Sequence, residues 1–355
     1  MKLEELGYDD HFERFKAGQN LTGFNTGRVI TEHKERYVVL TEKGEFEAEI
    51  TGNMRFTAEN RLDYPAVGDW VTLTVYDDDF AIIHQLFPRK SVLVRQAVGK
   101  PGDQQVIAAN IDFAFIVQSA DRDFNINRME RYLTLCYAAP VKPIFILSKI
   151  DLISDAELSG LLAQLNKRIK DTKVIPLSSQ TLKGYAALQS TLVKGKTYCL
   201  LGSSGVGKST IINNLAGQEL MKTSSISSST HKGKHTTNRR ELIVLGNGSV
   251  LIDTPGLREV GIADTTDGLE NTFDDIYKLS NRCRFTNCTH TREKGCAILE
   301  AVENGLVSKE SYSNYLKMVR EKARFNASIA EKRKKDKAFG KMCKEAMKYK
   351  KQKKI

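Results

Sequence analysis

A glycine-rich segment in the second half of the chain has the residue types and spacing of a phosphate-binding loop. It reads Gly202-Ser203-Ser204-Gly205-Val206-Gly207-Lys208-Ser209 and is followed by Thr210. Glycines let backbone N–H groups converge on phosphate oxygens in conformations that a Cβ atom would obstruct. Lys208 would bring a positive charge to the β- and γ-phosphates, and the Ser209 hydroxyl would bind Mg²⁺. We therefore predict that residues 202–210 bind a nucleotide and that Lys208 is catalytic.

A second phosphate motif, Asp253-Thr254-Pro255-Gly256, follows an apolar run that ends at Ile252. Asp253, at the end of such a strand, would hold Mg²⁺ through water, and the backbone N–H of Gly256 would contact the γ-phosphate. Many GTP-hydrolysing proteins have a glutamine after this glycine to orient the attacking water, but here the residue is Leu257. We therefore expect slow intrinsic hydrolysis that needs a partner or another side chain.

The segment between these two motifs is rich in serine, threonine, lysine and histidine. A polar sequence of this kind over residues 223–237 cannot form a packed core, which suits a switch that γ-phosphate and Mg²⁺ would order. Thr236 or Thr237 is the expected Mg²⁺ ligand, and His235 is a candidate for positioning the attacking water. The alternatives are that residues 223–237 form a plain surface loop and that His235 is an ordinary loop histidine without a catalytic role.

Earlier in the chain, Ser148, Lys149 and Asp151 have the spacing of a guanine-reading element. The Asp151 carboxylate would accept hydrogen bonds from the guanine N1–H and N2 amine, a donor pair that adenine lacks. Lys149 would lay its aliphatic stem along the base. Ser148 stands where asparagine is usual and can make only part of the hydrogen bonds of an amide. Ser178 and Ser179 would contact the guanine O6 through backbone N–H groups.

The order of these motifs along the chain is rotated. In an ordinary GTPase the base-reading element comes last, whereas here residues 148–151 precede the phosphate loop at 202–209. The rotation changes which part of the nucleotide-binding domain is joined to the rest of the protein. The second phosphate motif lies near the end of that domain, and we expect it to be connected to whatever follows.

Three cysteines and one histidine lie close together after the nucleotide motifs. Cys283, Cys288, His290 and Cys296 provide three thiolates and an imidazole, a donor set that suits tetrahedral zinc. Their spacing differs from that of common zinc fingers, and the alternative is a group of incidental cysteines. We predict one Zn²⁺ ion bound by these four side chains.

The elements around these motifs change in kind along the chain. Short strands separated by turn residues predict a barrel of the oligonucleotide-binding type, with no helix between its strands. From about residue 110, apolar runs alternate with helical patterns, which predicts an α/β domain with a mostly parallel sheet. The predicted strands are 28–30, 37–40, 46–51, 69–75 and 81–86 in the barrel, and 113–117, 143–147, 173–177, 196–201, 241–245 and 249–253 in the α/β domain.

The remainder of the chain is predicted to be helical, with a basic end. Ser308 would cap a helix whose apolar stripe includes Tyr312 and Val319. We divide the protein into three expected domains. These are an RNA-binding barrel at 1–90, a nucleotide-binding domain with rotated motifs at 91–275, and a zinc-binding domain with a basic helical tail at 276–355.

The net charge and the apolar content of the chain indicate which kinds of molecule it could bind. The chain of 355 residues carries a formal net charge of +11, which favours an anionic partner. A basic tail of this kind can also be a solvated, disordered end. Nucleic acid is favoured over a membrane because no apolar run approaches the ~20 residues that span a bilayer. The N-terminus lacks the apolar core of a signal peptide, so we expect a cytoplasmic protein. In that reducing compartment its cysteines should not form disulfides. We also expect the protein to be a monomer.

Together these features resemble one known family, the circularly permuted, small-subunit-dependent ribosomal GTPases of bacteria. The resemblance covers about residues 20 to 325. It rests on the rotated motif order and on three further segments, 105–112, 234–237 and 283–296. It implies an oligonucleotide-binding barrel, a permuted GTPase domain and a zinc domain. It also implies the small ribosomal subunit and its RNA as partners, a role in late maturation of that subunit, and hydrolysis that the subunit stimulates.

Two hypotheses of different classes follow. The first is a GTP hydrolase whose nucleotide state controls binding to ribosomal RNA, with GTP or GDP, Mg²⁺ and one Zn²⁺ as cofactors. The second is an RNA-binding module that uses GTP only as a conformational ligand, which Leu257 favours if nothing replaces the missing glutamine. An RNA-modifying enzyme or nuclease is a weaker third alternative, because no paired carboxylates or nucleophile constellation supports it.

Overall fold

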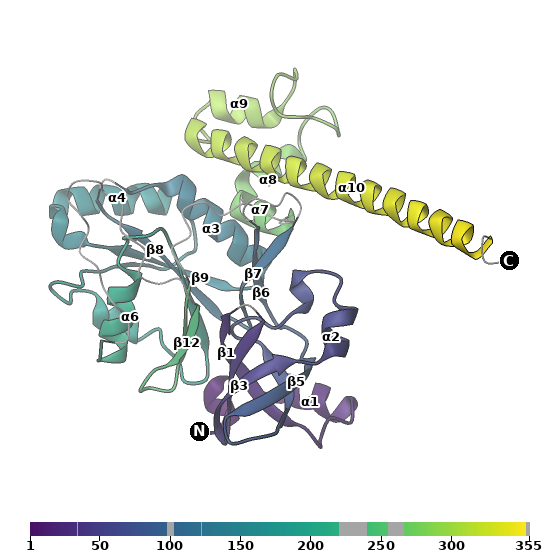
Figure 1. The fold of residues 1–355 in the computed structure, drawn as a ribbon. Helices are drawn as coiled ribbons and strands as arrows, with labels where there is room; N and C mark the ends of the chain where they lie inside the picture. Colours follow the sequence, from purple (N-terminus) through teal and green to yellow (C-terminus); the bar gives the residue numbers. More distant parts are fainter. Residues whose placement is uncertain (34, 98–102, 122, 220–239, 255–265, 353–355) are drawn as a thin grey trace, which may run out of the picture.

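The computed structural model describes residues 1–33, 35–97, 103–121, 123–219, 240–254 and 266–352. In chain order these residues form an N-terminal barrel, a central α/β part and a group of helices at the C-terminal end (Figure 1). One sheet of eleven strands runs through the first two parts. The architecture confirms the predicted combination of a barrel, an α/β domain and a helical end.

Five strands form the N-terminal barrel. They are β1 (Asn25–His33), β2 (Arg36–Thr41), β3 (Gly44–Ile50), β4 (Trp70–Val75) and β5 (Phe80–Leu86). The barrel closes because β1 pairs with both β2 and β4, while β3 pairs in parallel with β5. In β3 the apolar residues are buried and the glutamates between them are exposed, as its alternating sequence predicts. Every strand contributes apolar side chains to the interior.

The expectation that no helix interrupts the barrel strands is wrong. Helix α2 (Gly52–Thr57) and the short 3₁₀ helix η2 (Arg61–Asp63) lie between β3 and β4. The hydroxyl of Thr51 accepts a hydrogen bond from the Met54 backbone N–H at 3.2 Å and caps α2. Threonine and asparagine are common both in turns and at helix N-caps, so the local sequence did not separate the two structures.

The N-terminal residues cover one end of the barrel. They form the 3₁₀ helix η1 (Leu3–Leu6) and helix α1 (Asp10–Gly18). Phe12 of α1 is buried against Trp70 and Phe87, in a small aromatic core of its own.

The central part is a sheet with helices on both faces. Its strands are β8 (Phe113–Ser119), β9 (Lys142–Ser148), β10 (Val174–Pro176), β11 (Thr197–Leu201), β12 (Glu241–Val244) and β13 (Val250–Asp253). They lie in the order β10-β9-β8-β11-β13-β12, and only β12 is antiparallel to its neighbour. Helices α3 (Ile126–Ala138) and α4 (Asp155–Arg168) pack on one face. Helices α5 (Tyr185–Gln189) and α6 (Lys208–Ala216) pack on the other.

Two structural connections join the barrel to the central sheet. Strand β1 pairs with β12, with Thr31 opposite Glu241, which makes the two sheets continuous. The hairpin of β6 (Val92–Gln96) and β7 (Gln104–Ala109) lies between the two parts along the chain and was not predicted. The barrel is therefore attached to the sheet by backbone hydrogen bonds as well as by the chain itself.

A fully buried arginine in β1 strengthens this junction. Arg28 is 1% exposed, and burial lowers its pKa to about 10. Its guanidinium donates hydrogen bonds to groups from the N-terminus, the barrel and the central part. The acceptors are the carbonyls of Leu6, Gly68 and Asn110 and the hydroxyl of Thr197. The barrel cannot turn relative to the central sheet without breaking these bonds.

We expect Arg28→Ala to lower the free energy of unfolding by about 3 kcal/mol, because several buried acceptors would lose their donor. Urea denaturation of the full chain measures this change. Arg36→Ala is the matched control, since the Arg36 side chain in the next strand is 78% exposed. A loss for Arg28→Ala no larger than that of Arg36→Ala would contradict the role of this arginine in the junction.

The C-terminal helices enclose a separate apolar core. They are α7 (Thr266–Thr272), α8 (Asp274–Ser280), α9 (Ala297–Glu303) and α10 (Lys309–Gln352). This core contains Cys296, Ile298 and Met318, and also Leu269 and Phe273, which precede the expected boundary at 276. The predicted helix after Ser308 is confirmed as α10, which continues to Gln352 and extends away from the other elements (Figure 1). Among the described helices, none is both long and apolar enough to cross a membrane.

Candidate functional site

The predicted phosphate loop is the turn between β11 and α6. Strand β11 is buried along its whole length, and α6 begins at Lys208 with its N-terminus toward the loop. Gly205 and Gly207 have φ angles of +83° and +98°, which a side chain would disfavour. A Cβ atom on Gly202 would clash with the carbonyl oxygen of Val117 in β8. The loop therefore requires glycine at these positions, as the motif predicts.

Lys208 is folded over the loop that contains it. The side chain is buried, and its Nζ donates hydrogen bonds to the carbonyl oxygens of Gly202 at 3.0 Å and Ser203 at 2.9 Å. Burial lowers the pKa of this ammonium to about 8, although the charge of Asp253 acts in the opposite direction. Its hydrogen-bond partners in the described part of the chain are neutral carbonyl oxygens, so this buried cation is suited to receive the negative charge of a phosphate.

Asp253 ends β13 beside the phosphate loop. It is 2% exposed, and its Oδ1 is buried without a hydrogen-bond partner among the described residues. Burial raises the pKa of this carboxyl to about 6, partly opposed by Lys208. A buried carboxylate oxygen that lacks a donor is costly, and a cation with its water ligands would satisfy it. The residue therefore fits the predicted Mg²⁺ site, to which Ser209 would add its hydroxyl.

Several predicted site residues lie outside the described part of the chain. They are His235, Thr236 and Thr237 between the two phosphate motifs, and Gly256 and Leu257 after Asp253. Their assignments as Mg²⁺ ligands, water-positioning side chain and γ-phosphate contact stay predictions.

The predicted base-reading element, residues 148–151, lies at the end of β9 and just after it, at the same edge of the sheet. Asp151, in the 3₁₀ helix η3 (Ile150–Leu152), is exposed and accepts a hydrogen bond from the Ser178 hydroxyl at 2.6 Å. Ser178 is fully buried, so it holds the carboxylate from the protein side and leaves the other face open. The Ser179 hydroxyl lies 2.9 Å from that of Tyr185 in α5. Among the predicted guanine-reading residues, Asp151 and Ser178 are thus joined by a direct hydrogen bond, whereas Ser179 contacts Tyr185 of α5.

Lys149 and Ser148 are held in different ways. Lys149 has a φ angle of +57°, and its Nζ forms an ion pair with Asp121 at 3.3 Å. Ser148 is buried, and its Oγ donates a hydrogen bond to the Val206 carbonyl in the phosphate loop at 2.7 Å. The serine therefore connects the base-reading end of β9 to the phosphate loop, a contact that the motif comparison did not predict.

The sheet order explains how motifs in a rotated order meet. Strands β9, β8, β11 and β13 are parallel neighbours, so their carboxyl ends lie at one edge, where open α/β sheets bind ligands. Motif prediction missed two charged residues at this edge, Asp121 and Arg128, which contact Lys149 and Ser203. Only Asp121 comes just after the buried strand β8, whereas Arg128 lies in α3 and has no comparable local signal.

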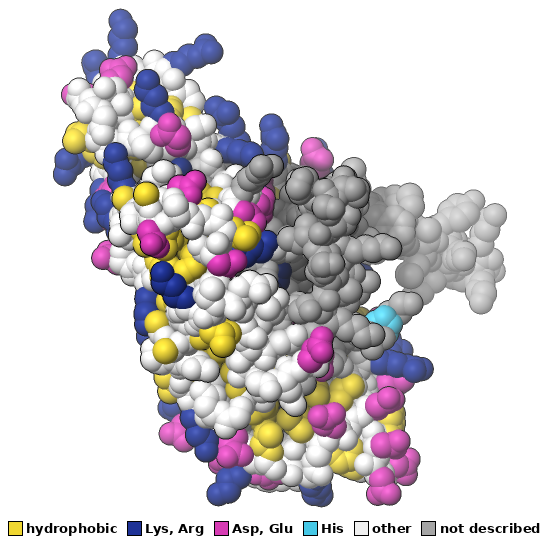
Figure 2. Space-filling view, turned by 90° about the vertical axis from the view of Figure 1, so that its left-hand side faces the viewer, with side chains coloured by type: hydrophobic (Ala, Val, Ile, Leu, Met, Phe, Trp, Pro, Cys, Tyr) yellow, Lys and Arg dark blue, Asp and Glu magenta, His cyan; other side chains and the backbone are white. Residues whose placement is uncertain are grey.

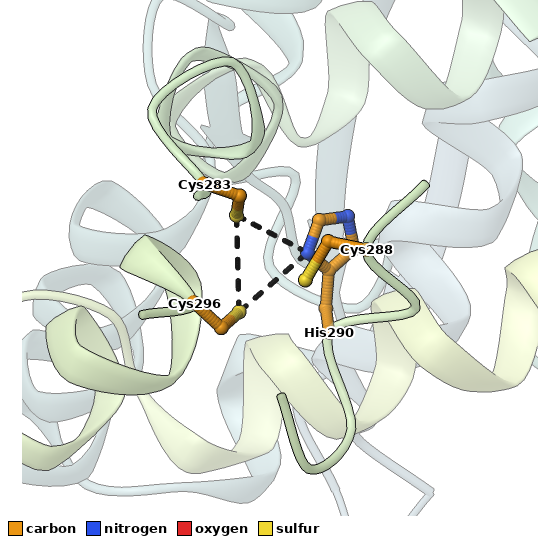
Figure 3. A group of neighbouring side chains, drawn as sticks. All are labelled: Cys283, Cys288, His290 and Cys296. Atoms are coloured by element: carbon orange, nitrogen blue, oxygen red, sulfur yellow. Dashed lines mark hydrogen bonds between the residues drawn. The ribbon is translucent and has the colours of Figure 1, made fainter. Parts of the chain in front are cut away.

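The four predicted zinc ligands converge in the C-terminal part (Figure 3). Their ligand atoms all lie within 4.8 Å of one another. The His290 Nδ1 is 3.6 Å from the Sγ atoms of both Cys283 and Cys296, and those two sulfurs are 3.9 Å apart. A zinc tetrahedron has S–S edges of about 3.8 Å and S–N edges of about 3.6 Å, given the usual bond lengths. The four side chains therefore fit one Zn²⁺ ion.

The backbone around these ligands is held by other residues. His290 has a φ angle of +59°, and its carbonyl accepts a hydrogen bond from the Tyr312 hydroxyl of α10 at 2.5 Å. The Glu293 carboxylate accepts hydrogen bonds from the Thr289 hydroxyl and from the backbone N–H groups of Arg292 and Thr289, which lower its pKa. Helix α10 is thus attached directly to the ligand loop.

We expect metal analysis of the full chain to find about one zinc ion per molecule, from the four-ligand count. Cys288→Ser should lower that content and destabilise the C-terminal core, since thiolate ligands hold zinc far better than a hydroxyl does. Cys343→Ser, in α10, is the control and should retain the metal. Carefully purified protein without zinc would exclude the site.

Comparison with known proteins places this geometry in a family. The sequence model of the family described as RsgA GTPase matches residues 86–263. The "Small ribosomal subunit biogenesis GTPase RsgA 1" of Bacteroides thetaiotaomicron is 40% identical over 98% of this chain and 97% of its own length. The "Small ribosomal subunit biogenesis GTPase RsgA" of Opitutus terrae is 39% identical over 91% of this chain and 90% of its own length.

A solved structure shares the architecture. It is described as "YloQ, a circularly permuted GTPase" and matches with a TM-score of 0.58 and 26% identity, over 85% of this chain and 96% of that one. Its description agrees with the rotated order of the motifs in this chain. On the family match and the identity to full-length relatives, this chain belongs to the RsgA GTPase family.

Proposed function

We propose that this protein hydrolyses GTP in the maturation of the small ribosomal subunit and that the subunit stimulates the reaction. The observation that carries the proposal is the meeting of Lys208, Asp253 and Asp151 at one edge of the sheet. GTP hydrolysis agrees with the family to which the chain belongs. The ribosomal role is taken from relatives that are named for small-subunit biogenesis.

In this proposal each group of residues has one task. Lys208 and the loop N–H groups hold the phosphates, Ser209 and Asp253 hold Mg²⁺ directly or through water, and Asp151 reads guanine. Bound Mg²⁺ would neutralise charge that develops on the phosphates. The proposed GTP-binding residues are Ser148, Lys149, Asp151, Ser178, Ser179, Gly202, Ser203, Ser204, Gly205, Val206, Gly207, Lys208, Ser209, Thr210, Asp253 and Gly256. Thr236 or Thr237 would complete the Mg²⁺ site, and His235 would position water.

We propose ribosomal RNA as the contact of the barrel and the zinc-bearing part. The net charge of +11 favours a partner that has an anionic surface. Near the zinc ligands, the exposed Arg284 guanidinium lies 5.5 Å from the ring centre of Phe285, which is 47% exposed. Lys and Arg side chains also project from much of the described surface on the face seen in Figure 2. We propose a monomer in the cytoplasm with domains at 1–90, 91–275 and 276–355.

Phosphate release measured with and without small ribosomal subunits tests the proposal. We expect subunits to raise the rate at least about tenfold, because the missing glutamine leaves intrinsic hydrolysis slow. Large subunits at the same concentration are the control. No stimulation, together with nucleotide-dependent RNA binding, would instead support a binding module that uses GTP as a conformational ligand.

We further propose that loss of the γ-phosphate moves the C-terminal helices relative to the barrel. The barrel is joined to the central sheet by strand pairing and by Arg28, so the C-terminal part is the better candidate for movement. It is attached through side chains on α3. Identical domain arrangements with a GTP analogue and with GDP, on and off the ribosome, would reject this movement.

A further inference from the structure

Helix α3 places an arginine against the phosphate loop. The Nη1 of Arg128 donates a hydrogen bond to the Ser203 hydroxyl at 2.9 Å. Ser203 is the second residue of the loop and is only 5% exposed. The contact joins two segments that are far apart in sequence, and none of the motif assignments uses this arginine.

A carboxylate also binds this guanidinium. Asp123 accepts hydrogen bonds from Nη1 at 2.7 Å and from Nη2 at 3.1 Å. A two-point contact of this kind sets the plane of the guanidinium as well as its position. The helix that carries Arg128 is itself anchored by buried Met129 and Leu133. The direction of the arginine is therefore determined by the fold and not by solvent.

Ser203 connects this arginine to the phosphate-binding lysine. Its hydroxyl is bound by Arg128, while its carbonyl oxygen accepts a hydrogen bond from the Lys208 Nζ at 2.9 Å. A shift of Ser203 would move one of the two carbonyls that hold Lys208. Phosphoryl transfer depends chiefly on the positions of charged groups around the phosphates, so such a shift would affect turnover.

We propose that Arg128 is a positioning residue for GTP hydrolysis, which fixes Ser203 and through it Lys208. The inference rests on the proposed assignment of residues 202–210 as the phosphate loop. Arg128 acts on the loop and not on the reacting atoms, so it affects the rate of the chemical step more than the binding of GTP.

The same helix also carries the main attachment of the C-terminal part. Glu130, the second residue after Arg128, accepts a hydrogen bond from Asn314 of α10 at 2.6 Å. Arg131 binds both carboxylate oxygens of Glu321, each at 2.8 Å. The positioning residue thus lies on the element through which a change in the C-terminal part would reach the phosphate loop.

Steady-state hydrolysis by the full-length protein tests the proposal. We expect Arg128→Gln to lower kcat about tenfold and to leave the KM for GTP within about twofold. Arg128→Lys should restore little of the rate, because an ammonium cannot make the two-point contact with Asp123 while it reaches Ser203. Arg55→Gln is the matched control, since Arg55 pairs with Glu35 on the barrel at 3.2 Å, remote from the loop.

A double-mutant cycle separates positioning from a general structural role. In a Ser203→Ala background, Arg128→Gln should change kcat by less than about twofold, because its target is already absent. An unchanged kcat for Arg128→Gln, or a full tenfold loss in both backgrounds, would overturn the inference. Lys208→Ala keeps this failure distinct from failure of the proposed function. Retained turnover in that variant would reject the phosphate loop itself, whereas its loss alongside an unaffected Arg128→Gln would reject only the role of Arg128.

Discussion

Lys208→Ala should lower kcat/KM for GTP by at least about a hundredfold, the effect of losing one charged group that stabilises a transition state. The lysine is the buried cation of the loop, and its Nζ is held by two carbonyl oxygens that orient it. No other residue of the loop carries a positive charge, and the adjacent Arg128 is already paired with Asp123. Phosphate release under single-turnover conditions measures the loss directly.

The Lys208→Ala variant should lose turnover but keep its stability. Burial lowers the pKa of Lys208, so the folded protein without a nucleotide holds the ammonium at a cost. Its removal should therefore leave the free energy of unfolding within about 1 kcal/mol of the original value. Lys183→Ala is the control, because that side chain is 65% exposed. Turnover near the original rate in a folded Lys208→Ala protein would show that the loop does not hold the substrate phosphates.

Asp151→Asn should weaken GTP binding by about a hundredfold and improve the binding of xanthosine triphosphate. The carboxylate accepts from two guanine donors, and an amide can accept from only one of them. Xanthine has an oxygen in place of the guanine N2 amine, and the amide N–H₂ of asparagine can donate to it. Ser178 would still hold the side chain in place, since its hydroxyl can bond to either group. Competition between the two nucleotides for the purified protein measures the change.

Asp155→Asn is the matched control for this specificity change. It removes the same charge four residues later, from a side chain that is 98% exposed. We expect this control to bind GTP as the original protein does. If Asp151→Asn also retains its preference for GTP, the carboxylate does not read the base and the guanine site lies elsewhere.

Local sequence patterns predicted most of the elements that carry the site. The five barrel strands and the six strands of the central sheet appear close to their predicted positions because each has a strong apolar period or run. The missed elements are short and include η1, α1, α2, η2, α5, α7, α8 and the hairpin of β6 and β7. Helices and strands of this length have weak local signals, and contacts with the rest of the fold decide whether they form.

The candidate site also contains both residues that local sequence predicts and residues whose contacts depend on the fold. Motif spacing selected Lys208, Asp253 and Asp151, and the described structure brings these residues to one edge of the sheet. It did not select Arg128 or Asp121, because their importance depends on partners that are distant in sequence. The contact of Ser148 with Val206 is of the same kind.

Local sequence is sufficient to predict the chemical groups that each segment of this chain offers. Glycines, a lysine, carboxylates and thiolates at set spacings specify which groups a segment can offer to phosphate, guanine and zinc, and that information is local. The fold is needed to bring the rotated motifs to one sheet edge, to join the barrel to the sheet through Arg28, and to set α3 between the predicted phosphate loop and the C-terminal helices. Those contacts join residues far apart in the chain, and their free energy depends on how the whole chain packs, which no single motif encodes.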